Sequence, residues 1–204
     1  MGSNAPSVAG TRTLIFSWRD SLPVTARIGL ALGMALVTGL LAQVRVPLPW
    51  TPVPMTGQTF AVLLAGVLLG RWWGGISQAL YVSLGVAGIP WFAGWAAGYG
   101  ILAGPTGGYL IGFVMAALFV GYFSERCGDG RRFPWLFALM LIADFVFIHV
   151  PGLLHLRGYY ALAGGNGASF MTLFLAGTAP FLIGDIIKVG AAASVATAIM
   201  PAGK

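Results

Sequence analysis

Long apolar runs, separated by short breaks rich in Gly and Pro, dominate this sequence. A membrane-spanning helix needs about 20 residues, because a rise of about 1.5 Å per residue must cross about 30 Å of hydrocarbon. Six runs are predicted to span a membrane, the second of them short: about 24–44, 57–70, 73–89, 106–124, 134–151 and 170–199. The sequence therefore predicts an all-α, multi-pass membrane protein with six transmembrane helices.

The charge content supports a membrane location and excludes one class of partner. Charged residues make up 8% of the chain, whereas a soluble domain carries about 25%. The net charge of +6 is spread in ones and twos and forms no basic stripe, so nucleic-acid binding is not expected. Residues 1–20 are predicted to be a flexible N-terminal tail, and residues 21–204 a single six-helix domain.

The distribution of cations predicts the orientation of the spans. An even number of spans puts both termini on the same side. With the N-terminus inside, the outer loops hold only Arg45 and Arg157. Such an excess of inner cations follows the positive-inside rule and predicts an N-in, C-in topology. The eight inner cations are Arg12, Arg19, Arg27, Arg71, Arg126, Arg131, Arg132 and Lys204.

Two of the predicted outer loops combine aromatic residues with Gly or Pro. They read "PLPWTPVP" (47–54) and "GIPWFAGWAAGYG" (88–100). Irregular backbone at membrane depth must be buried in protein or line a cavity, since lipid offers it no hydrogen bonds. The loops are therefore predicted to fold over a ligand pocket as lids. The alternative is an ordinary belt of interfacial aromatics.

Asp185 and Lys188 are two charges inside the last apolar run. They are three residues apart, which places them on one face of a helix. Each charge at a helix centre costs about 2.5–3.5 kcal/mol, and pairing offsets part of that cost. Pro180 and Gly184 loosen the turn before them. The pair is predicted to anchor a ligand that has a carboxylate and a polar N–H head; the alternative is a self-neutralising pair that only orients the helix.

Asp144, in the fifth span, either stays protonated as a hydrogen-bond donor or lines the same cavity. With Asp185 it could form the dyad of an intramembrane aspartyl protease, but Lys188 would keep Asp185 ionised, and "FLIGD" lacks the G-x-G-D arrangement of such proteases. His149 and His155 are six apart, on different helix faces, so no metal pair is expected. No Walker loop is present, so this chain is not expected to hydrolyse ATP.

Three stretches resemble one family. They are "PMTGQTFAVLLAGVLLG" (54–70), "GIPWFAGWAAGYGILAGPTGGYLIGF" (88–113) and "GTAPFLIGDIIK" (177–188). Their order and spacing are similar to those of the BioY family, the biotin-specific substrate-capture subunits (S components) of energy-coupling factor (ECF) transporters. The resemblance covers about residues 24–200. It implies the six-helix S-component fold and high-affinity capture of biotin at the outer face of a prokaryotic plasma membrane.

The resemblance also suggests how the site residues meet biotin, which has a ureido ring, an apolar thiophane ring and a valerate carboxylate. Asp185 would accept ureido N–H bonds, and Lys188 would pair with the carboxylate or keep Asp185 ionised. The aromatic side chains would wall the thiophane ring: Trp50, Trp91, Phe92 and Tyr99. Gly94 and Gly104 would let the backbone approach the ring closely. Gln58 and Tyr109 would make polar contacts.

The second loop departs from the family pattern. Related loops read more like "FAGG", with a polar or basic residue nearby, whereas this one reads "FAGWAAG" (92–98). No side chain from Gly94 to Gly104 is charged. The ligand carboxylate would then depend on Lys188, on backbone N–H groups, or on Arg45 at the base of the first loop.

The first predicted span carries small residues four apart, Ala31 and Ala35, overlapped by Gly29 and Gly33. Small residues let another helix approach closely in lipid. S components use a similar surface to dock on the transmembrane coupling subunit, so the resemblance implies that role for Ala31 and Ala35. Close packing within the chain is the alternative.

The resemblance implies a transporter subunit and not an enzyme. No cofactor or metal is expected, the ligand is biotin, and partner ATPase subunits would hydrolyse ATP. The rival hypotheses are an S component for thiamine or riboflavin, the protease described above, and a purely structural assembly protein.

Overall fold

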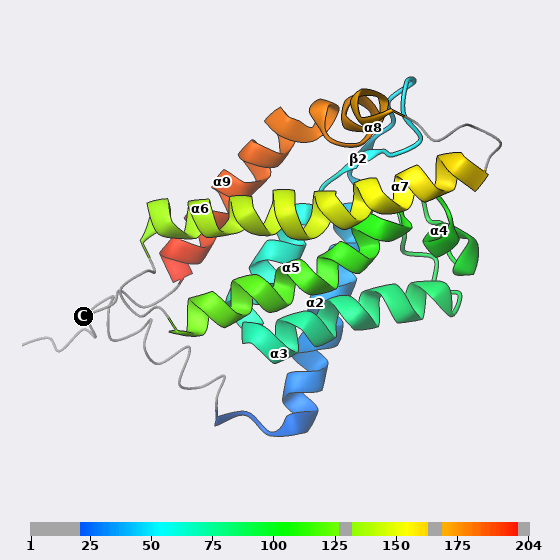
Figure 1. Cartoon of the computed structure of the whole chain (residues 1–204). Helices are drawn as coiled ribbons and strands as arrows, with labels where there is room; N and C mark the ends of the chain where they lie inside the picture. The colour runs from blue at the N-terminus through cyan, green and yellow to red at the C-terminus, as the bar shows by residue number, and fades with distance from the viewer. Residues whose placement is uncertain (1–20, 127–131, 163–168, 200–204) are drawn as a thin grey trace, which may run out of the picture.

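The computed structural model describes residues 21–126, 132–162 and 169–199, and the predicted tail (residues 1–20) lies outside these ranges. Two-residue strands pair antiparallel in the first loop, with Arg45 opposite Thr56. The other elements are helical (Figure 1): α2 (Val24–Gln43), β1 (Arg45–Val46), β2 (Met55–Thr56), α3 (Gln58–Val86), α4 (Tyr99–Ala103), α5 (Gly107–Arg126), α6 (Phe133–Ile142), η1 (Ala143–His149), α7 (Val150–Leu162), α8 (Phe170–Gly177), η2 (Ala179–Phe181) and α9 (Leu182–Ile199).

Five helical stretches of the described chain are long and apolar enough to cross a membrane, and they make the chain a membrane protein. The stretch in α3 contains a sharp change of direction (Figure 1). It occurs at Gly70, which has φ +79° and ψ −178°, a combination that essentially only glycine adopts. The two parts of α3 correspond to the second and third predicted spans. The count of six spans stays a prediction.

The fifth predicted span, 134–151, is too short: α6, η1 and α7 form one continuous helical stretch from Phe133 to Leu162. Pro151, at the end of the predicted span, lies inside this stretch. Its ring would normally meet the carbonyl of Phe147 and break the i→i−4 ladder. The segment immediately before it, η1, is π-helical, and its i→i−5 bonding spaces the carbonyls differently. The helix therefore continues beyond the proline.

The last apolar run is interrupted where Pro180 and Gly184 predicted a loosened turn. α8 ends at Gly177, Thr178 leaves helical geometry with φ −137°, and a short 3-10 turn leads into α9. α8 and α9 lie at a clear angle in Figure 1. The interruption places the start of α9, with Asp185 in its first turn, beside His149 at the end of η1.

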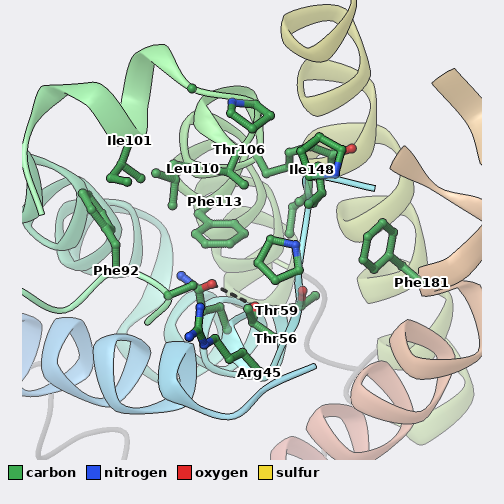
Figure 2. Close-up of a pocket in the computed structure, with 18 of the residues that line it drawn as sticks. Arg45, Thr56, Thr59, Phe92, Ile101, Thr106, Leu110, Phe113, Ile148 and Phe181 are labelled. Atoms are coloured by element: carbon green, nitrogen blue, oxygen red, sulfur yellow. Dashed lines mark hydrogen bonds between the residues drawn. The ribbon is translucent and has the colours of Figure 1, made fainter. Parts of the chain in front are cut away.

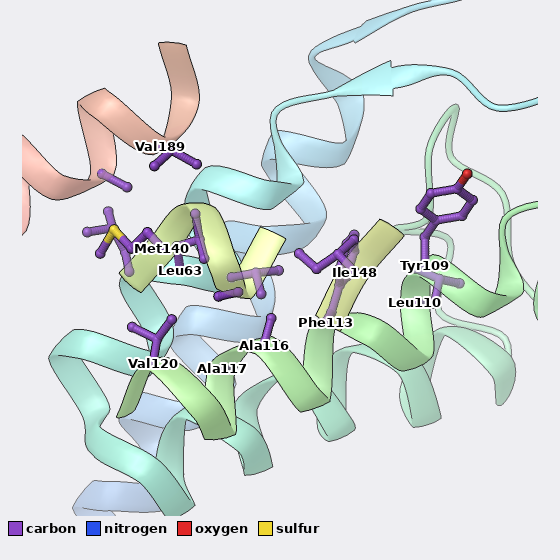
Figure 3. Close-up of a cluster of buried hydrophobic side chains, with 14 of the residues drawn as sticks. Leu63, Tyr109, Leu110, Phe113, Ala116, Ala117, Val120, Met140, Ile148 and Val189 are labelled. Atoms are coloured by element: carbon purple, nitrogen blue, oxygen red, sulfur yellow. The ribbon is translucent and has the colours of Figure 1, made fainter. Parts of the chain in front are cut away.

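The apolar core is built around α5, which packs chiefly on α3 and also on η1 and α7. Figure 3 shows one row of its side chains, from Leu110 through Phe113 to Val120, facing Leu63 of α3 and Ile148 of η1. All of these are buried. Because lipid is as apolar as these side chains, close packing is what holds the helices together.

Ala31 and Ala35 also belong to the interior. Both are completely buried by the chain itself, on the same face of α2 as Thr38, whose hydroxyl contacts Gln78 of α3. The expectation that these two alanines face a coupling subunit is therefore corrected: the small side chains let α2 approach α3. Gly29 lies on the exposed side of the helix.

The cations and the polar site lie at opposite ends of α5. The Arg71 and Arg126 guanidiniums sit 5.0 and 4.2 Å from the ring centroid of Tyr122. Tyr109 lies thirteen residues earlier, about 20 Å away along the helix axis. Arg71 and Arg126, two of the predicted inner cations, thus lie together away from the cavity described next.

Candidate functional site

A cavity of about 310 Å³ opens near the N-terminal end of α5. Its walls come from the first and second loops, the starts of α3 and α5, the end of η1, and the start of α9. Figure 2 shows apolar side chains around it, among them Phe92, Leu110, Phe113, Ile148 and Phe181. Cavities of this size with a few convergent polar groups are typical of small-molecule sites.

The predicted pairing of Asp185 with Lys188 is confirmed. Lys188 Nζ lies 2.5 Å from Asp185 Oδ1, and both residues line the cavity. Asp185 is 2% exposed. The same ammonium donates to the carbonyl oxygen of Thr56 at 2.9 Å. Lys188 therefore neutralises the buried carboxylate and ties α9 to the strand hairpin.

His149 is the residue that sequence reasoning missed, since it was interpreted as an interfacial or packing histidine. Its Nε2 lies 3.0 Å from Asp185 Oδ2. Its Nδ1 lies 3.1 Å from the carbonyl oxygen of Gly177 and 3.2 Å from Thr178 Oγ1. A ring N–H at Nε2 donates to the carboxylate and one at Nδ1 donates to the Gly177 carbonyl, so a ring that carries both protons makes both bonds. The available signal was a histidine inside an apolar run, five residues after Asp144.

Gln58 and Tyr109 line the cavity as expected, but their polar groups already have partners. The Gln58 amide donates to the Tyr81 hydroxyl at 2.8 Å and accepts from the Thr56 hydroxyl at 2.8 Å. The Tyr109 hydroxyl donates to the carbonyl of Gly177 at 2.8 Å. These contacts hold both side chains in place as walls of the cavity.

Phe92 and Gly104 also line the cavity. The Phe92 ring packs edge-on against Tyr81, with centroids 5.4 Å apart. The carbonyl oxygen of Gly104 faces His155 Nε2 at 2.9 Å. His155 therefore supports the wall at Gly104, and the two histidines have separate partners.

The structure does not bring the other four predicted residues to the cavity wall. Trp50 and Tyr99 are 65% and 70% exposed. The Trp91 indole donates to the carbonyl of Tyr81 at 2.9 Å, which points it into the packing below the loop. Gly94 lies against the guanidinium of Arg45. A loop sequence alone does not specify which face each aromatic residue takes.

Arg45, considered for the ligand carboxylate alongside Lys188, does line the cavity. Other residues that line the cavity were not predicted; they come from β2, the turn before α5, α5 itself, η1 and η2: Thr56, Thr106, Phe113, Ile148 and Phe181. These are ordinary polar and apolar residues whose types carry no distinguishing signal in sequence.

Asp144 lies beside this group without joining its hydrogen bonds. Neither of its carboxyl oxygens has a hydrogen-bond partner in the described part of the chain. One donor atom each from Asp144, His149 and Asp185 lie within 4.8 Å of one another, close enough for a metal ion. However, the Asp185 oxygens are already paired with His149 and Lys188, so an ion there would have to displace a cation.

Comparison with known proteins identifies relatives. A model of the BioY family matches residues 12–204. "Probable biotin transporter BioY" of Methanothermobacter thermautotrophicus is 44% identical over 138 residues, which is 68% of this chain and 88% of the relative. Biotin transporter BioY of Thermotoga maritima is 34% identical over 151 residues, covering 74% of this chain and 83% of the relative.

A solved structure has the same fold. It is a crystal structure of the S-component for biotin from an ECF-type ABC transporter, matched with a TM-score of 0.75 at 22% identity over 85% of this chain and 89% of the other. The family match spans nearly the whole chain and includes the helices that form the cavity. The chain therefore belongs to the BioY family.

Proposed function

We propose that this chain is the substrate-specific subunit of an ECF-type ABC transporter and that it captures biotin at the outer face of a prokaryotic plasma membrane. The observation that carries the proposal is the cavity: apolar walls surround one buried carboxylate that is paired with Lys188 and contacts His149. Its relatives named as biotin transporters support the choice of ligand. The chain is a transporter subunit and not an enzyme.

The proposed orientation is N-in and C-in, with six spans once α3 is counted as two. The cavity then opens outward, and the cations at the other end of α5 lie on the cytoplasmic side. Both aromatic loops contribute to the cavity, through Pro52–Pro54 and through Phe92 and Ala93. These loops are proposed to act as lids over bound ligand.

Within the cavity, Asp185 is proposed to accept hydrogen bonds from the ureido N–H groups of biotin. Lys188 keeps the carboxylate ionised and leaves it an acceptor. Phe92, together with the apolar side chains of α5, would wall the thiophane ring. Trp50 and Tyr99, which are exposed in this structure, would contact ligand only if their loops close over it.

Energy coupling is proposed to come from partners. The chain has no Walker loop, so ATP hydrolysis is assigned to ATPase subunits that act through a transmembrane coupling subunit. The burial of Ala31 and Ala35 means that docking would use a different surface from those two side chains.

Equilibrium binding of radiolabelled biotin, thiamine and riboflavin to the purified chain, without partner subunits, tests the proposal. We expect saturable binding of biotin alone. Retention of thiamine or riboflavin but not biotin would reassign the ligand, and absence of binding for all three would favour a structural assembly role. As a control for the protease alternative, no cleavage of membrane peptides is expected.

A further inference from the structure

Two arginines flank one tyrosine ring at the end of α5 that lies away from the cavity. The guanidiniums of Arg71 and Arg126 lie 5.0 and 4.2 Å from the ring centroid of Tyr122. The guanidinium of Arg71 also lies 4.5 Å from the ring centroid of Trp72. Such cation–π contacts hold a guanidinium in place without neutralising its charge. These residues form the arginine cluster: Arg71, Trp72, Tyr122 and Arg126.

The backbone brings the arginine cluster together at the bend of α3, which Figure 1 shows beside the end of α5. Gly70, with φ +79°, makes this bend immediately before Arg71. A Cβ built on Gly121 would lie 2.5 Å from the backbone nitrogen of Arg71, so the glycine is what lets α5 touch α3 here. The Glu125 carboxylate accepts from that same backbone N–H at 3.1 Å. The backbone of Arg71 is therefore fixed against α5.

The positive charge of the arginine cluster is not cancelled within the chain. Neither guanidinium makes a hydrogen bond or an ion pair with any residue that the structure describes. Glu125 contacts the backbone of Arg71, so two guanidiniums stand against one carboxylate. Arginine offers five N–H donors in a planar fork that matches a phosphate group. The arginine cluster is therefore suited to an anion that has several oxygens.

The arginine cluster lies at the depth of lipid headgroups. α5 has 20 residues, and at about 1.5 Å per residue it crosses about 30 Å, the thickness of the hydrocarbon core. Arg126 is the last residue of α5, so its guanidinium reaches the membrane surface. Trp72 is 62% exposed, and Trp and Tyr favour this level of a membrane. In the proposed orientation, the cluster faces the cytoplasmic leaflet, where anionic lipids attract basic residues.

We propose that the arginine cluster binds the phosphate of an anionic phospholipid headgroup. The two guanidiniums donate to the phosphate oxygens, Tyr122 positions both of them, and Trp72 packs beside the lipid. Basic surfaces between membrane helices on this side are typical of sites for anionic headgroups. A lipid is favoured over a protein partner because, at this depth, every copy of the chain already meets headgroup phosphates. The proposal does not depend on which ligand the cavity binds.

Thermal unfolding of the purified chain in a neutral detergent tests the proposal. Dioctanoyl phosphatidylglycerol, which is anionic, and dioctanoyl phosphatidylcholine, which is neutral overall, are titrated separately, and inorganic phosphate is the third probe. The concentration that gives half of the maximal stabilisation is compared. We expect phosphatidylglycerol to act at about 10-fold lower concentration than phosphatidylcholine, as for one charge-assisted contact. Inorganic phosphate should have no effect at the same concentrations.

The variants distinguish a built site from a general effect of charge. Arg71→Gln/Arg126→Gln should lose the preference for phosphatidylglycerol. Tyr122→Leu keeps both charges but removes the ring that positions them, so it should lose much of the preference too. Arg157→Gln is the matched control, since Arg157 is exposed on α7 and outside the cavity, and it should keep the preference. A cooperative unfolding transition without lipid verifies that each variant is folded.

If the double variant does not fold, the single variants Arg71→Gln and Arg126→Gln decide, and each should lose part of the preference. An equal response of the wild type to both lipids, or to inorganic phosphate and phosphatidylglycerol, would overturn the proposal. An unchanged preference in Tyr122→Leu would overturn it as well. Failure of the double variant to assemble with a coupling subunit, with its lipid preference retained, would assign the surface to a protein partner instead.

Discussion

Two variants, Asp185→Asn and Asp185→Asn/Lys188→Gln, distinguish a ligand-binding role of the ion pair from a structural role. In the wild type, Asp185 accepts from Lys188 at 2.5 Å and faces His149 at 3.0 Å. Asp185→Asn keeps the shape but removes the charge. Losing one partner of a buried pair costs about 3–5 kcal/mol. The Lys188 side chain is 17% exposed and retains its bond to Thr56, so we expect the lower end of that range.

The double variant Asp185→Asn/Lys188→Gln should recover most of this stability, because neither position then carries an unpaired charge. Its affinity for biotin should not recover. We expect both Asp185→Asn and the double variant to bind biotin at least about 10-fold more weakly than the wild type, which corresponds to about 1.4 kcal/mol. Equilibrium biotin binding and thermal unfolding, measured on the same purified samples, supply both quantities.

The refuting result is a double variant with wild-type stability and wild-type affinity. The pair would then serve only to neutralise itself within the membrane. Ile187→Ala is the matched control on the same helix, since Ile187 is 66% exposed and outside the cavity. It should change affinity little, which shows that an ordinary substitution in α9 is tolerated.

Three further substitutions test the supports of the site. His149→Ala should lower the free energy of unfolding by about 1–3 kcal/mol and weaken biotin binding, because the buried oxygens of Gly177 and Asp185 lose a partner. The control His155→Ala leaves the Asp185 contact in place, so the affinity for biotin should fall less. Gly70→Ala should lower the free energy of unfolding by about 1–3 kcal/mol, since alanine does not tolerate that backbone conformation. In the control Gly29→Ala, the added methyl group enters open space, and thermal unfolding should match the wild type. Ala31→Leu should lower the free energy of unfolding by about 1–3 kcal/mol through overpacking, which thermal unfolding measures. An unchanged unfolding temperature would mean that the helix there faces outward.

The sequence predicted the helical elements because apolar length is a local property. It placed the boundary of α2 and the turn near Gly70 correctly, since apolar runs, Gly and Arg signal them directly. It ended the fifth span too early, at residue 151, whereas the helix continues to Leu162 past a proline that the preceding π-helical segment accommodates. The sequence did not predict the burial of Ala31 and Ala35 either, because two small residues on one helix face can pack against a helix of the same chain or against another protein.

For the site, the contact predicted best was the local one. Asp185 and Lys188 are three residues apart, and helical geometry brings them together. His149 escaped prediction because its partners lie 28 to 36 residues away along the chain. Trp50 and Tyr99 were expected at the cavity from residue type alone, and loop conformation, which sequence spacing does not specify, exposes both.

The interruption between α8 and α9 has a consequence for how the cavity keeps its shape. In an unbroken helix, the carbonyl of Gly177 would receive the N–H of Phe181, but that N–H bonds to Thr178 instead. The released oxygen is shared by Tyr109 of α5 and His149 of η1. One main-chain atom thereby acts as a three-way junction between segments distant in sequence. A substitution that restored a straight helix would break both hydrogen bonds and let the rings of Tyr109 and His149 rotate. The cavity would then change shape although none of the residues that line it had been replaced.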